Sequence, residues 1–102
     1  MSWADAAIRK LADGEPAVIQ PRGHSMRPKV LSGATVHLHP NDRPDELKVG
    51  DIVLVRVAGS VYLHLISAAD AKRVQISNNR GRVNGWVSRQ AVYGRAVQII
   101  NP

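Results

Sequence analysis

The sequence predicts a mainly β domain with one short helix at its N-terminal end. Only one segment has the spacing of an amphipathic helix, and the rest consists of short runs rich in Val and Ile, separated by Gly, Pro, Asn and Asp. Branched side chains favour strands because they pack well on a pleated surface. Since 102 residues fall within the usual size of one domain, we expect a single domain over 1–102. It would contain a helix within 1–14 and a β domain over 17–100.

The helical pattern covers residues 3–12. A serine precedes it and is suited to cap its first turn, a glycine stands where a helix ends, and Pro16 prevents continuation. The expected apolar face consists of Trp3, Ala7, Ile8 and Leu11, with Ser2 as the cap.

The strand pattern is clearest in "DIVLVRV", which is apolar on both faces and therefore predicts a central strand covered on both sides. "AGS" then reverses the chain into "VYLHLI", which predicts a hairpin. Alternation places Val61, Leu63 and Leu65 on one face of its second strand, and Tyr62, His64 and Ile66 on the other. "NNRGRVNG" is typical of a turn. The predicted strands are 17–20, 34–39, 51–58, 60–67, 72–77 and 92–100.

The charge is positive and unevenly placed. The net charge is +6, and no acidic residue follows Asp70. Such asymmetry is compatible with a surface for nucleic acid, acidic protein or anionic lipid, and equally with a solubilising face. No aromatic array accompanies it as a stacking platform for bases. The basic residues after Asp70 are Lys72, Arg73, Arg80, Arg82, Arg89 and Arg95.

Several classes of site and location are excluded by composition. The chain has no Cys, so it has no disulfide and no Cys-based metal or redox site, and we expect no cofactor. The first 15 residues include acidic side chains and no apolar signal-peptide core, and no run approaches the ~18 apolar residues of a membrane span. We therefore expect a soluble, cytoplasmic chain without a membrane partner.

Two histidines on a predicted strand form half of a metal site. His37 and His39 lie two residues apart in "TVHLHP" and so share one face. No carboxylate stands at a supporting spacing, so the pattern favours a half-exposed strand with Val36 and Leu38 facing inward. We predict no metal.

The short stretch "GHSMRP", residues 23–28, follows the strand-like run "AVIQP". Ser25 could cap a turn, with Pro28 placed just inside it. A serine becomes a nucleophile only with an adjacent base and with donors for the developing oxyanion. Ser25 alone therefore does not distinguish a capping residue from a nucleophile, and the order of the segments around it is needed.

That order resembles the signal peptidase I and LexA-type serine peptidase domains. The segments are "GHSMRP", "LSGATVHLHP", "LKVGDIVLVRV", "VYLHLI", "QISNNRGRVNGWV" and "VYGRAV", which together span about residues 17–98. The resemblance implies a small, coiled antiparallel β domain that cleaves peptide bonds of a peptide or protein substrate bound as an added strand.

By this resemblance Ser25 is the nucleophile and His64 the general base. In having histidine at the position of the base, the chain resembles the endoplasmic-reticulum-type signal peptidases. Bacterial signal peptidases and LexA-type proteins have Lys at that position. The backbone N–H of Ser25, after flexible Gly23, would help form the oxyanion hole. Met26 would pack near the substrate cleft, and Tyr62 is a further candidate for a residue that lines this cleft.

Three positions depart from the family pattern. The family's "GDN" segment reads "SNN" at 77–79, the Asp that often supports a base histidine appears as Asn84, and Leu65 replaces a basic residue after His64. Asn can orient an imidazole, but it stabilises an imidazolium less well than a carboxylate does. Autocleavage has two candidate positions, the Ala58–Gly59 turn and the "WADAA" segment, both in predicted structure that a protease cleft does not accept.

Two functions therefore remain open. One is a stand-alone serine peptidase that uses Ser25 and His64. The alternative is a non-catalytic module of the same fold, which binds nucleic acid through its basic C-terminal half or a regulatory partner in a phage or bacterial system. Neither a membrane anchor nor a helix-turn-helix is evident, which argues against an exported-preprotein peptidase and a self-cleaving repressor.

Overall fold

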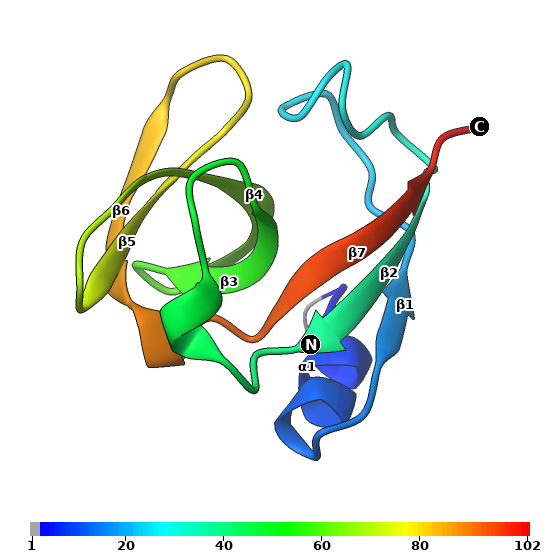
Figure 1. Ribbon diagram of the computed structural model, residues 1–102. Coiled ribbons are helices and arrows are strands. Elements are labelled where there is room, and N and C mark those ends of the chain that lie inside the picture. Colours follow the sequence, from blue (N-terminus) through cyan, green and yellow to red (C-terminus); the bar gives the residue numbers. More distant parts are fainter. Residues whose placement is uncertain (1–2) are drawn as a thin grey trace.

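The computed structural model describes residues 3–102 as one antiparallel seven-stranded sheet with a short helix (Figure 1). This arrangement confirms the mainly β prediction. The sheet order is β1-β2-β7-β3-β4-β5-β6. The elements are α1 (Asp5–Ala12), β1 (Ala17–Ile19), β2 (Thr35–Pro40), the 3₁₀ turn η1 (Pro44–Glu46), β3 (Ile52–Val57), β4 (Ser60–Ala69), β5 (Arg73–Ser77), β6 (Val83–Ser88), the 3₁₀ turn η2 (Arg89–Ala91) and β7 (Gly94–Ile100).

The sheet curls around two apolar clusters. Figure 1 shows β1, β2 and β7 on one side, with α1 beside them, and β3 to β6 wound together on the other. Alternate residues of β3 enter the two clusters: Ile52 and Leu54 face α1 and β2, whereas Val53 and Val55 face β5. All four are buried, so β3 is the doubly covered strand that its sequence predicts. The hairpin to β4 is confirmed as well, with Val57 opposite Ser60.

The helix begins later than its sequence pattern predicts. It starts at Asp5, and Trp3 precedes it with 53% of its surface exposed, so the prediction that Trp3 lies on the apolar face is wrong. Ala4 is instead buried beside Ala7 and Leu11, because these small and apolar side chains fit against β1 and β2. The predicted cap Ser2 lies outside the described residues. Within residues 3–102 no helix has the length and apolar character needed to cross a membrane.

The sequence prediction missed strand β6, which was expected to be a turn. Two glycines in "RGRVNGW" favour that interpretation, but Gly85 lies within the strand, opposite Ile76. Its φ is +148°, and an added Cβ would come within 3.1 Å of Val57 Cγ1. Gly85 therefore marks a close approach of β6 to β3 and not a reversal of the chain.

Candidate active site

Three polar side chains from separate parts of the chain form a continuous hydrogen-bonded row. The Oγ atom of Ser25 lies 3.1 Å from Nε2 of His64, and Nδ1 of the same ring lies 2.7 Å from Oδ1 of Asn84. The fold thus brings together three of the residues singled out in the sequence. Such a row is the arrangement in which a base can activate a hydroxyl while a third group orients the base.

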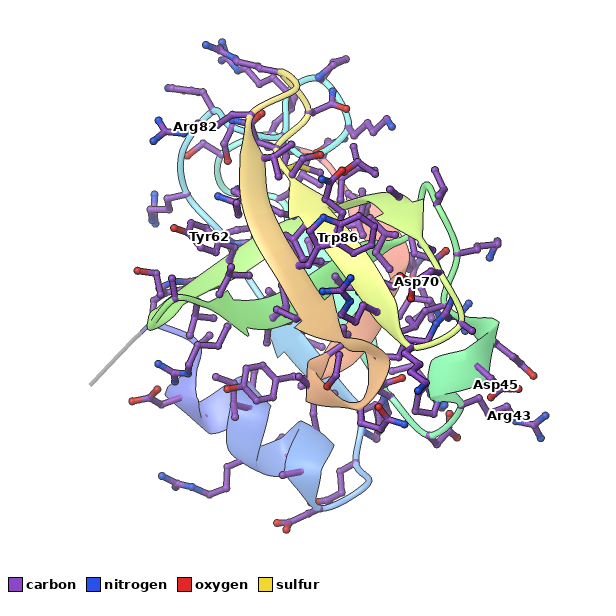
Figure 2. The ribbon with its side chains drawn as sticks, turned by 90° about the vertical axis from the view of Figure 1, so that its left-hand side faces the viewer. Arg43, Asp45, Tyr62, Asp70, Arg82 and Trp86 are labelled. Atoms are coloured by element: carbon purple, nitrogen blue, oxygen red, sulfur yellow. The ribbon has the colours of Figure 1, made fainter. Side chains whose placement is uncertain are left out.

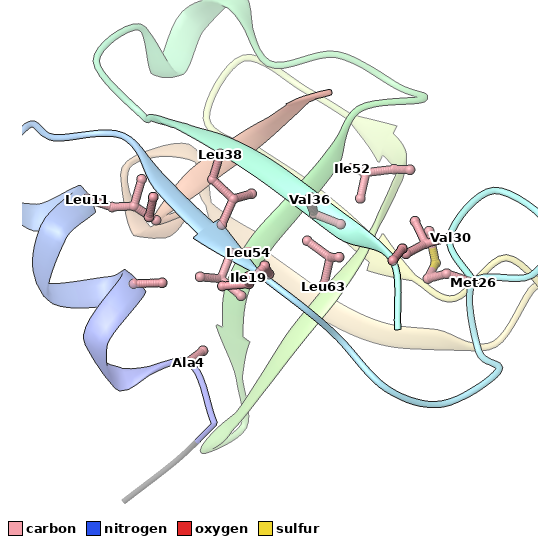
Figure 3. Packing of buried hydrophobic residues seen from close by; sticks show 13 residues of the cluster. Ala4, Leu11, Ile19, Met26, Val30, Val36, Leu38, Ile52, Leu54 and Leu63 are labelled. Atoms are coloured by element: carbon pink, nitrogen blue, oxygen red, sulfur yellow. The ribbon is translucent and has the colours of Figure 1, made fainter. Parts of the chain in front are cut away.

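Ser25 stands in the connection between β1 and β2, which we call the serine loop (residues 20–34). Ser25 itself is exposed, but the next residue, Met26, is buried beside Val30 and attaches the loop to the apolar cluster (Figure 3). Gly23 has a φ of +112°, which a side chain would strain, and its N–H donates to Ser32 Oγ at 3.2 Å. The loop therefore holds an exposed hydroxyl on a fixed backbone.

His64 lies in the middle of β4, between β3 and β5, with only 7% of its surface exposed. Its ring stacks on that of Tyr62, with centroids 4.7 Å apart and planes inclined by 23°. The imidazole is therefore held by a strand that pairs with Val53 of β3 at His64 and with β5 from Leu65 onward, and by an aromatic ring.

A β-bulge places Asn84 against His64. In the pairing of β5 with β6, Ile76 lies opposite Gly85 and Ser77 opposite Val83, so Asn84 is the extra residue. A bulge of this kind turns a side chain out of the regular alternation. The sequence identified Asn84 by its place after "SNN", but its position in a bulged strand could not be predicted from a segment interpreted as a turn.

The hydrogen bonds fix the state of the imidazole. An amide oxygen only accepts, so Nδ1 of His64 carries the proton and donates to Asn84. Nε2 is then unprotonated and can accept the hydroxyl proton of Ser25. Burial lowers the pKa of His64 below its usual 6.5, and the hydrogen bond with Asn84 opposes that shift in part. The ring is consequently neutral at physiological pH and able to act as a base.

Asn79 fastens a second loop to the serine loop, a role that the sequence did not reveal. Its backbone N–H donates to the carbonyl oxygen of Ser25 at 2.9 Å, and its Nδ2 donates to that of Arg27 at 2.6 Å. Asn78, its neighbour, instead accepts from the N–H groups of Arg80 and Arg82 within its own turn. The "SNN" segment thus ties the β5–β6 turn to the backbone of Ser25.

A cleft of about 470 Å³ opens onto Ser25 and His64. Apolar side chains of Met26, Val61 and Leu63 line it, together with Ser25 and His64 of the row. Tyr62, the predicted cleft residue, lines it too, although its ring also stacks on His64. In the part of the chain that the structure describes, no hydrogen bond uses the backbone N–H of Ser25, so this donor is free to face a ligand.

The two histidines considered as metal ligands, His37 and His39, lie away from the row, on β2. His39 approaches Asp42 at 3.4 Å, while Val36 and Leu38 are buried as predicted. Across residues 3–102 no group of three or more His, Cys, Asp or Glu side chains could hold a metal ion.

Comparison with known proteins leaves the site to be judged by its geometry. The chain matches no protein-family model. No curated protein matches it in sequence either.

Proposed function

We propose that this chain is a serine peptidase of the signal peptidase and LexA type, with Ser25 as nucleophile and His64 as general base. The single observation that carries the proposal is the row from Ser25 through His64 to Asn84, whose first two members line a largely apolar cleft. The antiparallel, coiled β architecture and the order of its segments support the assignment to this type.

The reaction would follow from the contacts of the row. Ser25 Oγ attacks the carbonyl carbon of a peptide bond while its proton passes to Nε2 of His64, 3.1 Å away. The N–H of Ser25 donates to the resulting oxyanion. Collapse of the tetrahedral adduct breaks the C–N bond, and His64 gives its proton to the departing amine. His64 then takes a proton from water, which hydrolyses the acyl ester, and returns that proton to Ser25.

Asn84 is the positioning residue in this scheme. It holds the tautomer in which Nε2 has a free lone pair, and it supports the imidazolium that forms during each proton transfer only by an uncharged dipole. The base does not need the deep desolvation that a lysine base requires, because an imidazole is already neutral near pH 7.

Mass spectrometry of a diverse peptide pool tests the proposal. The parent protein should cleave peptides, while Ser25→Ala should show no cleavage and His64→Ala should lose about 10²- to 10⁴-fold in rate. His37→Ala, which removes a histidine outside the row, is the matched control and should retain the parent rate. Equal cleavage by the parent and by Ser25→Ala would show that the assignment is wrong.

A second candidate is a non-catalytic module of the same fold. One observation favours it, namely that an uncharged amide stands behind His64 where a carboxylate would best support catalysis. Binding of nucleic acid through the C-terminal half would then show a log affinity that falls steeply with log salt. Two of the basic residues of this half have internal contacts: Arg73 lies over the Trp86 ring at 5.3 Å, and Arg89 donates to three backbone carbonyls.

A further inference from the structure

Two neighbouring loops carry a concentration of unpaired positive charge beside Ser25. The serine loop and the β5–β6 turn (residues 77–83) contain no Asp or Glu. Of the 14 Lys and Arg residues five lie in these loops, and the other nine nearly balance the eight acidic residues. We call these five exposed side chains the cationic rim: Arg22, Arg27, Lys29, Arg80 and Arg82.

The rim is one surface because Asn79 joins its two loops. The hydrogen bonds from Asn79 to the carbonyl oxygens of Ser25 and Arg27 bring the turn that bears Arg80 and Arg82 against the serine loop. Figure 2 shows Arg82 at the upper end of the molecule, whereas Asp45 and Asp70 lie at the side, away from it. These two acidic side chains thus lie where they do not neutralise the rim.

Within residues 3–102, no rim side chain forms an ion pair with another side chain. Basic residues elsewhere do: Arg43 pairs with Glu46, Lys48 with Asp51, and Arg73 with Asp70. Like charges held together without counter-charges raise the local potential and attract an anionic ligand. The rim is therefore available for a partner, and its charge is not needed for internal pairing.

The rim continues into the cleft. Arg22 lines the cleft together with Ser25 and His64, and it is the one Lys or Arg side chain among the described residues that does so. A ligand in the cleft therefore faces a cationic residue in addition to the apolar residues Met26, Val30 and Leu63.

We propose that the cationic rim selects polypeptide substrates that carry Asp or Glu side chains beside the segment bound in the cleft, with Arg22 as the innermost specificity-determining residue. The inference rests on the proposed peptidase function. Acidic polypeptide is favoured over nucleic acid for two reasons. Most residues that line the cleft are apolar, and neither loop carries a Phe, Tyr or Trp on which a base could stack. Trp3 and Tyr62 line the cleft itself, and the Tyr62 ring already stacks on His64.

The experiment uses two peptides that the parent protein cleaves and that differ only in having Glu or Gln at the flanking positions. The ratio of their kcat/KM values measures the rim, whereas cleavage of the Gln peptide alone measures the Ser25–His64 pair. The Glu peptide should be preferred, and the preference should fall about 3- to 10-fold in Arg80→Gln/Arg82→Gln and in Arg22→Gln. Raising the ionic strength from about 0.05 M to about 0.5 M should also reduce it.

Lys10→Gln/Lys72→Gln is the matched control for the double variant. It makes the same change in net charge at exposed positions on α1 and on the β4–β5 connection, and it should leave the preference unchanged. If this control reduced the preference as much as the rim variants do, overall charge and not the rim would be responsible, and the proposal would be overturned.

Binding to Ser25→Ala separates this proposal from the peptidase proposal. The inactive protein should bind the fluorescent Glu peptide more tightly than the Gln peptide, whether or not the parent cleaves either one. Equal binding of the two peptides would overturn the rim proposal while leaving the row intact. Tighter, rim-dependent binding of a single-stranded oligonucleotide of equal charge would overturn it as well, in favour of a nucleic-acid surface.

Discussion

The Nδ1 atom of His64 lies 2.7 Å from the Oδ1 atom of Asn84, the extra residue in the bulge of β6. An amide oxygen in this place fixes the tautomer of the ring as a carboxylate would, because both only accept. It does so without a negative charge, so an imidazolium formed in the proposed reaction would receive less stabilisation. The ring is thus oriented as a base would be, but Asn84 stabilises its protonated form less than a carboxylate would.

Replacement of Asn84 should separate these two contributions. Asn84→Asp keeps the acceptor and adds a charge, which should raise the pKa of His64 and increase the rate wherever the ring stays neutral. Asn84→Ala removes the acceptor and should reduce kcat/KM by about tenfold to 10³-fold, because the ring can then adopt the other tautomer or rotate. Peptide cleavage measured across pH reports both effects.

Asn78→Ala is the control for these variants. Asn78 accepts hydrogen bonds within the β5–β6 turn but has no bond to His64, so its removal should leave the pH profile where it is in the parent. If Asn84→Asp left the profile unmoved as well, the contact with His64 would have no part in the reaction.

The pH dependence of the parent should report the burial of His64. Burial lowers the pKa of the ring below 6.5, and the proposed reaction needs the neutral ring. We expect kcat/KM to rise with pH and to reach its plateau with an apparent pKa below 6.5. An acidic limb centred clearly above that value would assign the titration to another group.

The stability of the fold should also depend on pH through His64, because protonation of its ring favours the unfolded chain. The pKa of His64 is lower in the folded protein than the ~6.5 of the unfolded chain, so the unfolded chain binds more protons between these values. The free energy of unfolding should therefore fall as pH decreases through the window from about 6.5 down to the folded pKa. Urea titrations of the parent and of His64→Gln should show this slope in the parent and a smaller one in the variant.

The sequence predicts most of the sheet because its signals are local. The two-sided apolar run 51–57 and the "AGS" reversal each predict an element that the structure contains. β6 escaped prediction because Gly85 serves a close contact with Val57, which is remote in sequence. The role of Asn79 escaped for a similar reason, since its partners Ser25 and Arg27 are about 50 residues away and no spacing encodes them.

Ala58, in the hairpin between β3 and β4, has a strained backbone conformation that a substitution can make less costly. Ala58 has a φ of +49° and Gly59 of +87°, the conformation of a two-residue turn in which Asn-Gly is preferred. Ala58→Asn should stabilise the protein by about 1 kcal/mol, because a left-handed conformation costs alanine roughly that much. Urea unfolding measures the change, and Ala91→Asn, at an exposed site with φ outside the positive region, should give no comparable gain.

Removal of the Asn79 side chain should reduce activity through the serine loop. Asn79→Ala loses the bond from Nδ2 to the Arg27 carbonyl, which should cost about 1 kcal/mol of stability and loosen the backbone around Ser25. Because the pKa of His64 depends on its own surroundings, kcat should fall while the pH midpoint stays fixed. Hydrogen exchange should be faster in the serine loop and unchanged in β3.

In Asn78→Ala the β5–β6 turn should loosen while the serine loop keeps its protection. Faster exchange throughout the sheet of Asn79→Ala would instead mean that this asparagine supports the whole fold, and that its bond to the serine loop has no special role in placing the nucleophile.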